Sequence, residues 1–282
     1  MSPIVFEISL IVATFNRCHS LARLLKSLEC LELPDAGTLE GLVVDNDSSD
    51  GTRGLLLEKQ QRSLKYSLTI LHEPQRGKSA ALNLGLKNCR GKIICVVDDD
   101  VILDSQWIRG VMESHQICRF DALQGRVLPG VDPFGNTADP NRLTGTNMSF
   151  KRGVFERVGF FDIRLGPGAS GFSEDTEFSR RIRAAGFNIG YTPYPVVYHE
   201  LDPARYGRRY NRAVQHRKGL SRSIYREESM FGKVLPELVG NCFKFCIYAA
   251  LGKTGKLYRA EGRILRGLGY LQGRVGASKG RE

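Results

Sequence analysis

The stretch KIICVVDDDV, residues 92–101, joins an apolar run to three consecutive aspartates. Its apolar part has the continuous hydrophobicity of a strand that is buried on both faces of a parallel sheet. Asp98, Asp99 and Asp100 follow at once, and carboxylates packed this closely repel one another unless solvent or a cation compensates them. The stretch therefore predicts a buried strand that ends either in a solvated acidic turn or at a cation site.

A cation site at this strand end has a definite chemistry. Asp98 and Asp100 are separated by one residue, so in extended backbone their side chains project to the same side. Two carboxylates on one side suit a hard divalent cation such as Mg²⁺ or Mn²⁺. Such a cation can bridge to the phosphates of a nucleotide and stabilise a departing diphosphate.

The residues before the triplet alternate between predicted strands and helices. Strands are expected at 8–16, 39–46, 67–73 and 92–100, and helices at 20–31 and 78–89. This alternation is typical of an α/β fold with a mostly parallel central sheet flanked by helices. Ligands of such sheets bind beyond the carboxyl ends of the strands, which here read ATFN, VVDND, LHEP and VVDDD. No GxGxxG follows the first strand and no GxxxxGK[ST] occurs, which argues against a dinucleotide-binding or P-loop phosphate grip.

A further helix, expected over 173–186, carries two acids in its first turn, Glu174 and Asp175. A carboxylate in this position can act as a general base toward an alcohol. Acids in a first turn also complement the helix dipole without any catalytic role. The sequence leaves both interpretations open for this pair.

Two further side chains are candidates for metal or phosphate contacts. A strand expected over 188–200 ends in His199, and a neutral imidazole ligates divalent metals, although a lone histidine is more often structural. Lys78 lies in QRGKSAALN at the start of a predicted helix, where a cation and backbone N–H groups can meet a phosphate. The alternative for Lys78 is a solvated loop.

The overall composition, with 41% hydrophobic and 25% charged residues among 282, is that of a globular protein. We expect a first domain over residues 1–202 and a basic helical region over 203–282. No stretch reaches the about 18 uncharged apolar residues of a membrane span, and the N-terminal residues lack the pattern of a signal peptide. Seven cysteines without CxxC pairs suit reduced thiols in a cytoplasm.

The positive charge is concentrated in the last region. Residues 203–282 contain 18 Lys and Arg against 5 Asp and Glu, whereas residues 1–202 contain 23 against 25. Over 256–274, apolar residues share one helical face opposite the basic ones: Leu257, Ile264, Leu268 and Leu271. An anionic membrane surface, a phosphorylated substrate and nucleic acid all match this charge, and the apolar stripe favours the membrane over nucleic acid.

Seven segments, taken in order over residues 7 to about 200, resemble the family 2 glycosyltransferases, which have the GT-A fold. The resemblance implies an inverting, bacterial-type enzyme with a mostly parallel, Rossmann-like sheet and, in this chain, a basic helical C-terminal extension. The segments are SLIVATFNR, VVDNDSSDGT, RGKSAALNLGL, CVVDDDV, TGTNMSFKRGVFERVGFFD, SEDTEFSRRIRAAGF and VVYHE.

The resemblance also implies roles for the acids and the histidine. Asp175, in the ED motif after Glu174, would be the base that deprotonates the acceptor hydroxyl. Asp100 would be the principal ligand of Mn²⁺ or Mg²⁺, and His199 would complete the metal and diphosphate site. Asp98 and Asp99 would lie toward the ribose, with Asp98 also a candidate metal ligand.

The remaining implied contacts concern the donor and the acceptor. The nucleotide base would lie against two strand ends, Lys78 near the diphosphate, and Asn147 near the donor sugar and acceptor. The base-contacting residues would be Ala13, Thr14, Phe15, Asp45 and Asn46. Many relatives have a second acid where this chain has Asn46, so uridine, thymidine and guanosine donors all stay open. The absence of QxxRW argues against the processive synthases.

The predicted activity is therefore metal-dependent transfer of a hexose from a nucleoside diphosphate sugar to a hydroxyl of a glycan or lipid-linked acceptor. We expect a peripheral protein on the inner face of the cell membrane that takes part in cell-envelope polysaccharide synthesis. Two alternatives are a non-catalytic scaffold that binds nucleotide sugars and a nucleotidyltransferase. The intact acids disfavour the first, and ATFNRCHS is not the Gly-rich phosphate loop that the second needs.

Overall fold

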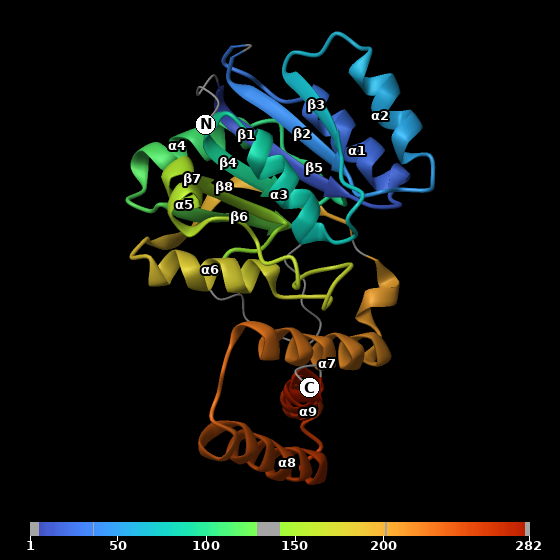
Figure 1. The fold of residues 1–282 in the computed structure, drawn as a ribbon, viewed down its shortest axis with the longest axis vertical. Coiled ribbons are helices and arrows are strands. Elements are labelled where there is room, and N and C mark those ends of the chain that lie inside the picture. Colours follow the sequence, from blue (N-terminus) through green and yellow to red (C-terminus); the bar gives the residue numbers. More distant parts are fainter. Residues whose placement is uncertain (1–5, 36, 129–141, 201, 280–282) are drawn as a thin grey trace. The chain divides into compact units, whose positions relative to one another are not determined.

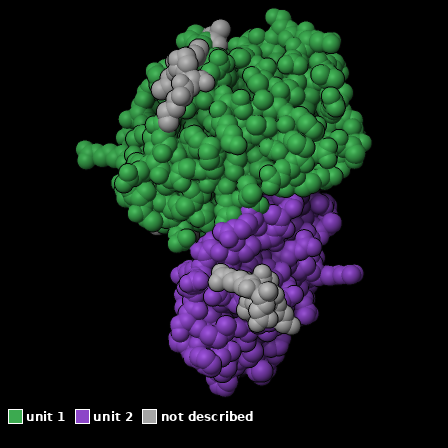
Figure 2. All heavy atoms as spheres, in the orientation of Figure 1, with its two compact units in different colours: residues 1–131, 138–163, 174–200 green, residues 132–137, 164–173, 201–282 purple. Residues whose placement is uncertain are grey.

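The computed structural model describes residues 6–35, 37–128, 142–200 and 202–279. The chain divides into two compact units, coloured separately in Figure 2. The sheet unit takes in residues 1–131, 138–163 and 174–200, and the helical unit takes in 132–137, 164–173 and 201–282, apart from the residues outside the description. Each unit is treated separately below.

An eight-stranded sheet with the order β3-β2-β1-β4-β7-β6-β8-β5 forms the centre of the sheet unit (Figure 1). The half β3-β2-β1-β4 is parallel throughout, which confirms the parallel arrangement that the apolar runs predict. β7 pairs antiparallel with both β4 and β6, so the complete sheet is mixed. The strands are β1 (Phe6–Thr14), β2 (Leu39–Asp45), β3 (Ser67–His72), β4 (Gly91–Val97), β5 (Val101–Leu103), β6 (Ala122–Leu128), β7 (Asn147–Lys151) and β8 (Ile189–His199).

Helices cover both faces of this sheet. One core cluster joins α1, α2 and α4 to the sheet, and a second joins α3, α5 and α6 to the opposite face. The helices expected at 20–31, 78–89 and 173–186 are present with shifts of one or two residues, whereas α2, α4 and α5 were not predicted. The bounds are α1 (Cys18–Glu29), α2 (Thr52–Gln60), α3 (Lys78–Asn88), α4 (Trp107–Ile117), α5 (Arg152–Val158) and α6 (Glu174–Ala184).

The strand registers bring the polar strand ends to one edge of the sheet. Thr14 at the end of β1 pairs with Asp45 at the end of β2, and Val12 pairs with Val97, directly before the aspartate triplet. The apolar strand residues are buried on both faces, so the chain can place charged groups only where these strands end. The edge predicted to bind a ligand is therefore the edge where the acids gather.

The helical unit is built from α7 (Arg208–Tyr225), α8 (Leu235–Ala250) and α9 (Thr254–Lys279), with short helices η1 (Pro203–Tyr206) and η2 (Met230–Val234). α7 and α9 approach closely through small residues. A Cβ atom on Gly219 would lie 2.1 Å from the Arg266 carbonyl oxygen, and one on Gly269 would lie 2.1 Å from the His216 carbonyl oxygen. The inner face of α9 is therefore made mainly of glycine and alanine, not of its leucines.

The exposed apolar stripe of the helical unit lies on α8. Val239, Phe243 and Ile247 are 67%, 68% and 38% exposed, and no residue of α8 is buried. In α9, the leucine face that the sequence predicts at the surface is mostly half-buried, with Leu268 the exposed member at 44%. Within the described residues, no helix is both long and apolar enough to cross a membrane.

Two helix glycines provide a test of the packing that supports the sheet edge. A Cβ atom on Gly110 in α4 would lie 2.7 Å from the backbone of Tyr194 and Pro195, whereas one on Gly54 in α2 would meet nothing within 4 Å. We expect Gly110→Ala to lower the free energy of unfolding by about 1–3 kcal/mol because β8 must shift. Gly54→Ala should raise it by about 0.5–1 kcal/mol.

Urea unfolding midpoints of the two variants measure this difference. A Gly110→Ala protein that unfolds at the wild-type midpoint would show that α4 and β8 do not pack this closely.

Candidate active site

The aspartate triplet lies beyond β4 with each acid bound by a different set of partners. Asp99 accepts a hydrogen bond of 2.8 Å from the Thr14 hydroxyl at the end of β1. Burial raises the pKa of Asp99 to about 6, although Arg17 and the Thr14 hydrogen bond oppose the increase. Asp99 is therefore protonated more easily near neutral pH than an ordinary aspartate.

Asp98 forms one side of a charged cluster centred on Lys78. Lys78, the first residue of α3, makes an ion pair with Asp98, and its Nζ lies 3.6 Å from Glu174 Oε1. The Thr146 hydroxyl donates to the other Asp98 oxygen at 2.9 Å. Burial alone would lower the pKa of Lys78, but Asp98 and Glu174 outweigh it and raise that pKa above its ordinary value.

The backbone beside this cluster approaches Lys78 closely. A Cβ atom on Gly145 would lie 2.7 Å from Lys78 Nζ, the far end of a flexible side chain. A larger residue here would therefore make the ammonium group shift relative to Asp98.

Asp100 lies between a cation and a histidine. Its Oδ2 accepts a hydrogen bond of 2.5 Å from Arg17 Nη1, and its Oδ1 lies 3.4 Å from His199 Nε2. Antiparallel pairing of β5 with β8 sets Val101 opposite His199 and so brings the histidine to the triplet. Although burial would raise the pKa of Asp100, the contacts with His199 and Arg17 hold it far below its usual range.

The candidate metal ligands separate into two groups. Asp100 and His199 are adjacent, whereas both oxygens of Asp98 are engaged by Lys78 and Thr146. Within the described ranges, no cluster of three or more His, Cys, Asp and Glu side chains is arranged to hold a metal. One carboxylate and one imidazole still fit Mg²⁺ or Mn²⁺, because such ions commonly take their other ligands from substrate phosphates and water.

The two acids at the start of α6 have different environments. Glu174 is 7% exposed, and burial, reinforced by Asp175, raises its pKa to about 7 against the opposing effect of Lys78. Asp175 is half-buried, and its Oδ1 accepts hydrogen bonds from the backbone N–H and the hydroxyl of Thr176. Among the described contacts none involves Asp175 Oδ2, so this oxygen is available to an incoming hydroxyl.

Asn46 organises the loop that follows β3. Its amide nitrogen donates to the carbonyl oxygens of Glu73 and Gln75 at 2.9 and 2.7 Å, and its Oδ1 accepts from the Gly77 N–H at 2.8 Å. A carboxylate cannot donate, so an acid here would lose both bonds to the carbonyls. The Asn46 amide therefore holds the loop that leads to Lys78.

The other predicted base-contacting residues line the same edge. Asp45 is buried and accepts from the Ser48 N–H at 3.1 Å, and Ala13 is half-buried beside Thr14. Phe15 is 37% exposed, and the Arg76 guanidinium lies 4.0 Å from the centre of its ring. This cation–π pair forms a flat, half-exposed surface next to the strand ends.

The side chain of Asn147 is directed into the protein. Its Oδ1 accepts from the Trp107 indole at 3.1 Å, and its Nδ2 donates to the carbonyl oxygens of Arg126 and Pro195 at 2.9 and 2.8 Å. Asn147 is 2% exposed, and its neighbour Thr146 is the residue whose side chain reaches Asp98. The structure therefore joins Asn147 to the site through the backbone of β7.

Arg17 and Thr146 are the two site residues that the sequence interpretation missed. Arg17 comes three residues after Thr14, the end of β1. A cation at this sheet edge with no assigned role could have been predicted to pair with one of the three acids. Thr146 had no such signal, because only the pairing of β4 with β7 brings its segment to Asp98.

The sequence model of Glycosyl transferase family 2 matches residues 9–171. The succinoglycan biosynthesis protein ExoM of Rhizobium meliloti is 28% identical over 208 residues, which cover 68% of this chain and 66% of that protein. The glycosyltransferase AglE of Haloferax volcanii is 27% identical over 210 residues, which cover 70% of this chain and 67% of that protein. The matched part thus spans about two thirds of the length of these relatives.

A solved structure supports the fold. The mannosyltransferase PcManGT of Pyrobaculum calidifontis, in complex with GDP-Man and Mn²⁺, aligns with a TM-score of 0.70 at 19% identity, covering 94% of this chain and 87% of that one. Its similarity agrees with the mixed sheet and the two helix layers described above. Because the family model matches more than half of the residues, this chain belongs to glycosyl transferase family 2 and has the GT-A fold.

Proposed function

We propose that this chain is an inverting hexosyltransferase that moves a sugar from a nucleoside diphosphate donor to an acceptor hydroxyl. The observation that carries the proposal is the convergence of Lys78, Arg17 and the aspartate triplet beside a half-buried Asp175 with one unengaged oxygen. Cations placed there match a diphosphate, and the adjacent carboxylate matches an acceptor that must lose a proton.

The donor would occupy the carboxyl edge of the parallel strands. Its base would lie against Phe15 and the strand ends at Ala13, Thr14, Asp45 and Asn46, with the ribose toward Asp98 or Asp99. Asn147 would act near the donor sugar and acceptor by fixing the backbone on which Thr146 stands. The proposal names no particular nucleotide, since the Asn46 amide makes hydrogen bonds to the loop after β3.

A divalent metal, Mn²⁺ or Mg²⁺, would be held by Asp100 and His199, with Asp98 as a further candidate. When bound, the ion supplies positive charge for the diphosphate leaving group. Lys78 and Arg17 lie beside Asp98 and Asp100 and would add charge at the same place. The mannosyltransferase complex with Mn²⁺ supports a metal requirement in this fold.

Asp175 would take the proton of the acceptor hydroxyl while that hydroxyl attacks the anomeric carbon. Because attack comes from the face opposite the leaving diphosphate, an α-linked donor would give a β-linked product. Because the pKa of Glu174 is raised to about 7, Glu174 is mostly protonated below that pH. The proposed base then has no second full negative charge beside it.

The acceptor is proposed to be a glycan or lipid-linked hydroxyl at the inner face of the cell membrane, in cell-envelope polysaccharide synthesis. The basic excess of residues 203–282 and the exposed apolar stripe of α8 support membrane-surface association of the helical unit. The name of the succinoglycan biosynthesis relative supports a polysaccharide product. Nucleic acid fits less well, because bases and phosphates offer nothing to the apolar stripe.

The first prediction concerns the catalytic base. Asp175→Asn should lower the turnover number for sugar transfer by about 10²–10⁴-fold, because a neutral amide cannot take the acceptor proton. Donor affinity, measured by calorimetry with the nucleoside diphosphate sugar, should stay within about twofold, because Asp175 does not hold the diphosphate. Glu174→Gln is the matched neighbour, and a larger loss of turnover in that variant would transfer the role of base to Glu174.

The second prediction concerns the metal. Chelation should weaken donor binding by wild type at least about tenfold, and Asp100→Asn should weaken it similarly with metal present. Asp104→Asn, an acid a few residues beyond the triplet, is the control and should bind donor normally. Equal donor affinity with and without metal in wild type would rule out the metal site.

The third prediction concerns pH. The pKa of Glu174 is raised from 4.5 to about 7, so between these values the folded chain holds a proton that the unfolded chain has released. The free energy of unfolding should therefore decrease as pH rises through this window. Denaturant titrations should show a smaller decrease for Glu174→Gln, while the exposed Glu58→Gln should follow wild type. Parallel curves for all three proteins would contradict the raised pKa.

A further inference from the structure

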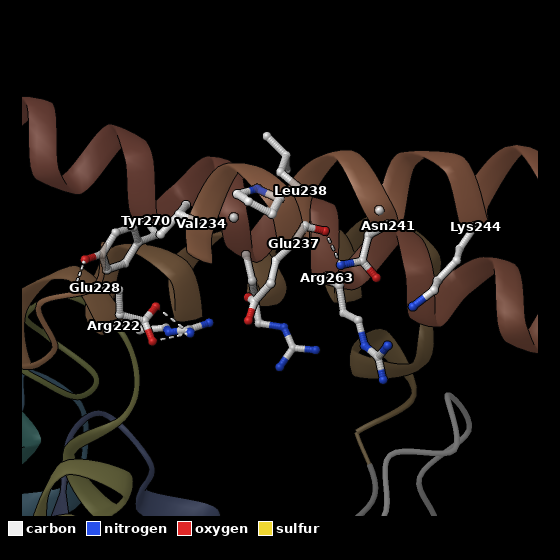
Figure 3. Close-up of a pocket in the computed structure, with 13 residues that line it drawn as sticks. Arg222, Glu228, Val234, Glu237, Leu238, Asn241, Lys244, Arg263 and Tyr270 are labelled. Carbon is white, nitrogen blue, oxygen red and sulfur yellow. Dashed lines mark hydrogen bonds and ion pairs between the residues drawn. The ribbon is translucent and has the colours of Figure 1, made fainter. Parts of the chain in front are cut away.

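The helical unit contains a cavity of about 440 Å³ between the end of α7, η2, α8 and α9 (Figure 3). Its lining includes the cations Arg222, Lys244, Arg263 and Arg266 and a single carboxylate on each of two segments, Glu228 and Glu237. Figure 3 shows the side chains of Lys244 and Arg263 directed toward the same end of this cavity from different helices. The cavity belongs to the helical unit alone and is separate from the candidate active site.

Among the described residues, Arg222 is the one lining cation that pairs with an acid. Glu228 is already bound by Arg222 at 2.5 Å, Arg226 at 2.9 Å and Lys233 at 2.8 Å. Glu237 is exposed and makes no ion pair among the described residues. Lys244, Arg263 and Arg266 likewise have no acidic partner within the described part of the chain. A surplus of positive charge therefore faces the cavity.

Arg266 is the lining cation whose surroundings most clearly disfavour its positive charge. It is half-buried, and its Nε makes one long hydrogen bond of 3.5 Å to the Gly262 carbonyl oxygen of its own helix. Burial lowers the pKa of Arg266, and the neighbouring Arg263 and Arg222 lower it further. Arg222 and Arg266 are both half-buried, and an anion bound beside such guanidinium groups offsets the cost of burying their charge.

The cavity also has buried polar atoms without hydrogen-bond partners and a wall that is fixed by hydrogen bonds. Arg222 Nε and Asn241 Oδ1 are buried without a hydrogen-bond partner. The Tyr270 hydroxyl accepts from the Glu228 N–H at 2.9 Å and donates to the Arg226 carbonyl oxygen at 3.1 Å, which fixes one wall. The remaining Asn241 oxygen can accept from a hydroxyl of a ligand. Free donors and an acceptor inside a held cavity are the pattern of a polar binding site.

We propose that this cavity binds a dianionic phosphate group, held by Arg263, Arg266 and Lys244. Phosphate presents several oxygens to converging guanidinium donors, and arginine binds it through paired hydrogen bonds, which a point charge alone cannot match. The cavity volume accommodates a phosphorylated headgroup as well as a free ion. If the phosphate belongs to a lipid, this site would contribute to the membrane association proposed above. The proposed site does not depend on sugar transfer.

Arg263→Ala in the full-length chain is the test variant, and Arg259→Ala is the matched control. Both are exposed arginines of α9 one helical turn apart, so the two changes remove the same charge, and Arg263 is the one that lines the cavity. One arm titrates inorganic phosphate by calorimetry. A second arm compares flotation with phosphatidylcholine vesicles that contain phosphatidic acid or phosphatidylglycerol at matched surface charge. A third arm titrates a single-stranded oligonucleotide.

We expect Arg263→Ala to weaken binding to phosphatidic acid vesicles or to inorganic phosphate by about tenfold, as for loss of a charge-assisted hydrogen bond. Arg259→Ala should weaken binding to phosphatidic acid vesicles and to inorganic phosphate by no more than the small amount by which it weakens binding to phosphatidylglycerol vesicles. Loss in both phosphate arms supports a site for phosphate from either source. Loss in the vesicle arm alone assigns the site to a lipid headgroup, and loss in the ion arm alone assigns it to a soluble phosphate.

Three results would overturn the proposal. Equal effects of the two arginine variants would show general surface charge, and wild-type binding without preference for phosphate would remove the site. Oligonucleotide binding that depends on Arg263 more than phosphate binding does would assign the cavity to nucleic acid. Donor affinity measured on the same samples separates these outcomes from failure of the proposed sugar transfer, because Arg263 lies outside the candidate active site.

Discussion

Charge compensation at one edge of the sheet is the constraint on which the rest of this structure depends. The acids that follow β4 are almost buried, and each is stable there because a particular partner meets it. Lys78 meets Asp98, and Arg17 and His199 meet Asp100. The partners come from the starts of helices and the end of a distant strand, so the sheet unit must close around the triplet for the acids to be tolerated.

The same arrangement separates the chemical roles of neighbouring carboxylates. Two acids adjacent in sequence at the start of α6 differ because Glu174 is buried beside Lys78, whereas Asp175 is half-buried and bonds Thr176 through one oxygen. Within the triplet, Asp99 and Asp100 have pKa values displaced in opposite directions by burial and by their cationic neighbours. The proposed metal ligand Asp100 is therefore held ionised while Asp99 beside it is protonated more easily than an ordinary aspartate.

The helical unit follows a different principle. Glycines let α7 and α9 approach almost to backbone contact, so the close packing consumes few apolar side chains. The apolar residues of α8 are left exposed, and Arg263 and Arg266 line a cavity without an acidic partner among the described residues. Both features are unfavourable for an isolated unit in water, and a lipid surface with phosphate groups would relieve both.

The strand arrangement could be predicted from the sequence better than the side-chain partners could. The parallel half of the sheet and the edge at which its acids gather followed from the sequence, because continuous apolar runs that end in acids can be buried in few ways. The roles implied for Asp175, Asp100 and His199 came from the order of the motifs, and they stay proposals for this chain. The role of Arg17 could not be assigned from the sequence, because its partner Asp100 lies 83 residues further along the chain.

The sequence by itself therefore determined the family, the parallel core and the edge at which the acids lie, since these depend on local hydrophobicity and on short motifs. Only the tertiary structure decided which partner each acid has, because strand pairing and helix starts from distant segments supply them. It also decided that Asn46 holds a loop, that Asn147 faces inward and that α8 carries the exposed stripe. These outcomes depend on distances between segments that no periodicity encodes.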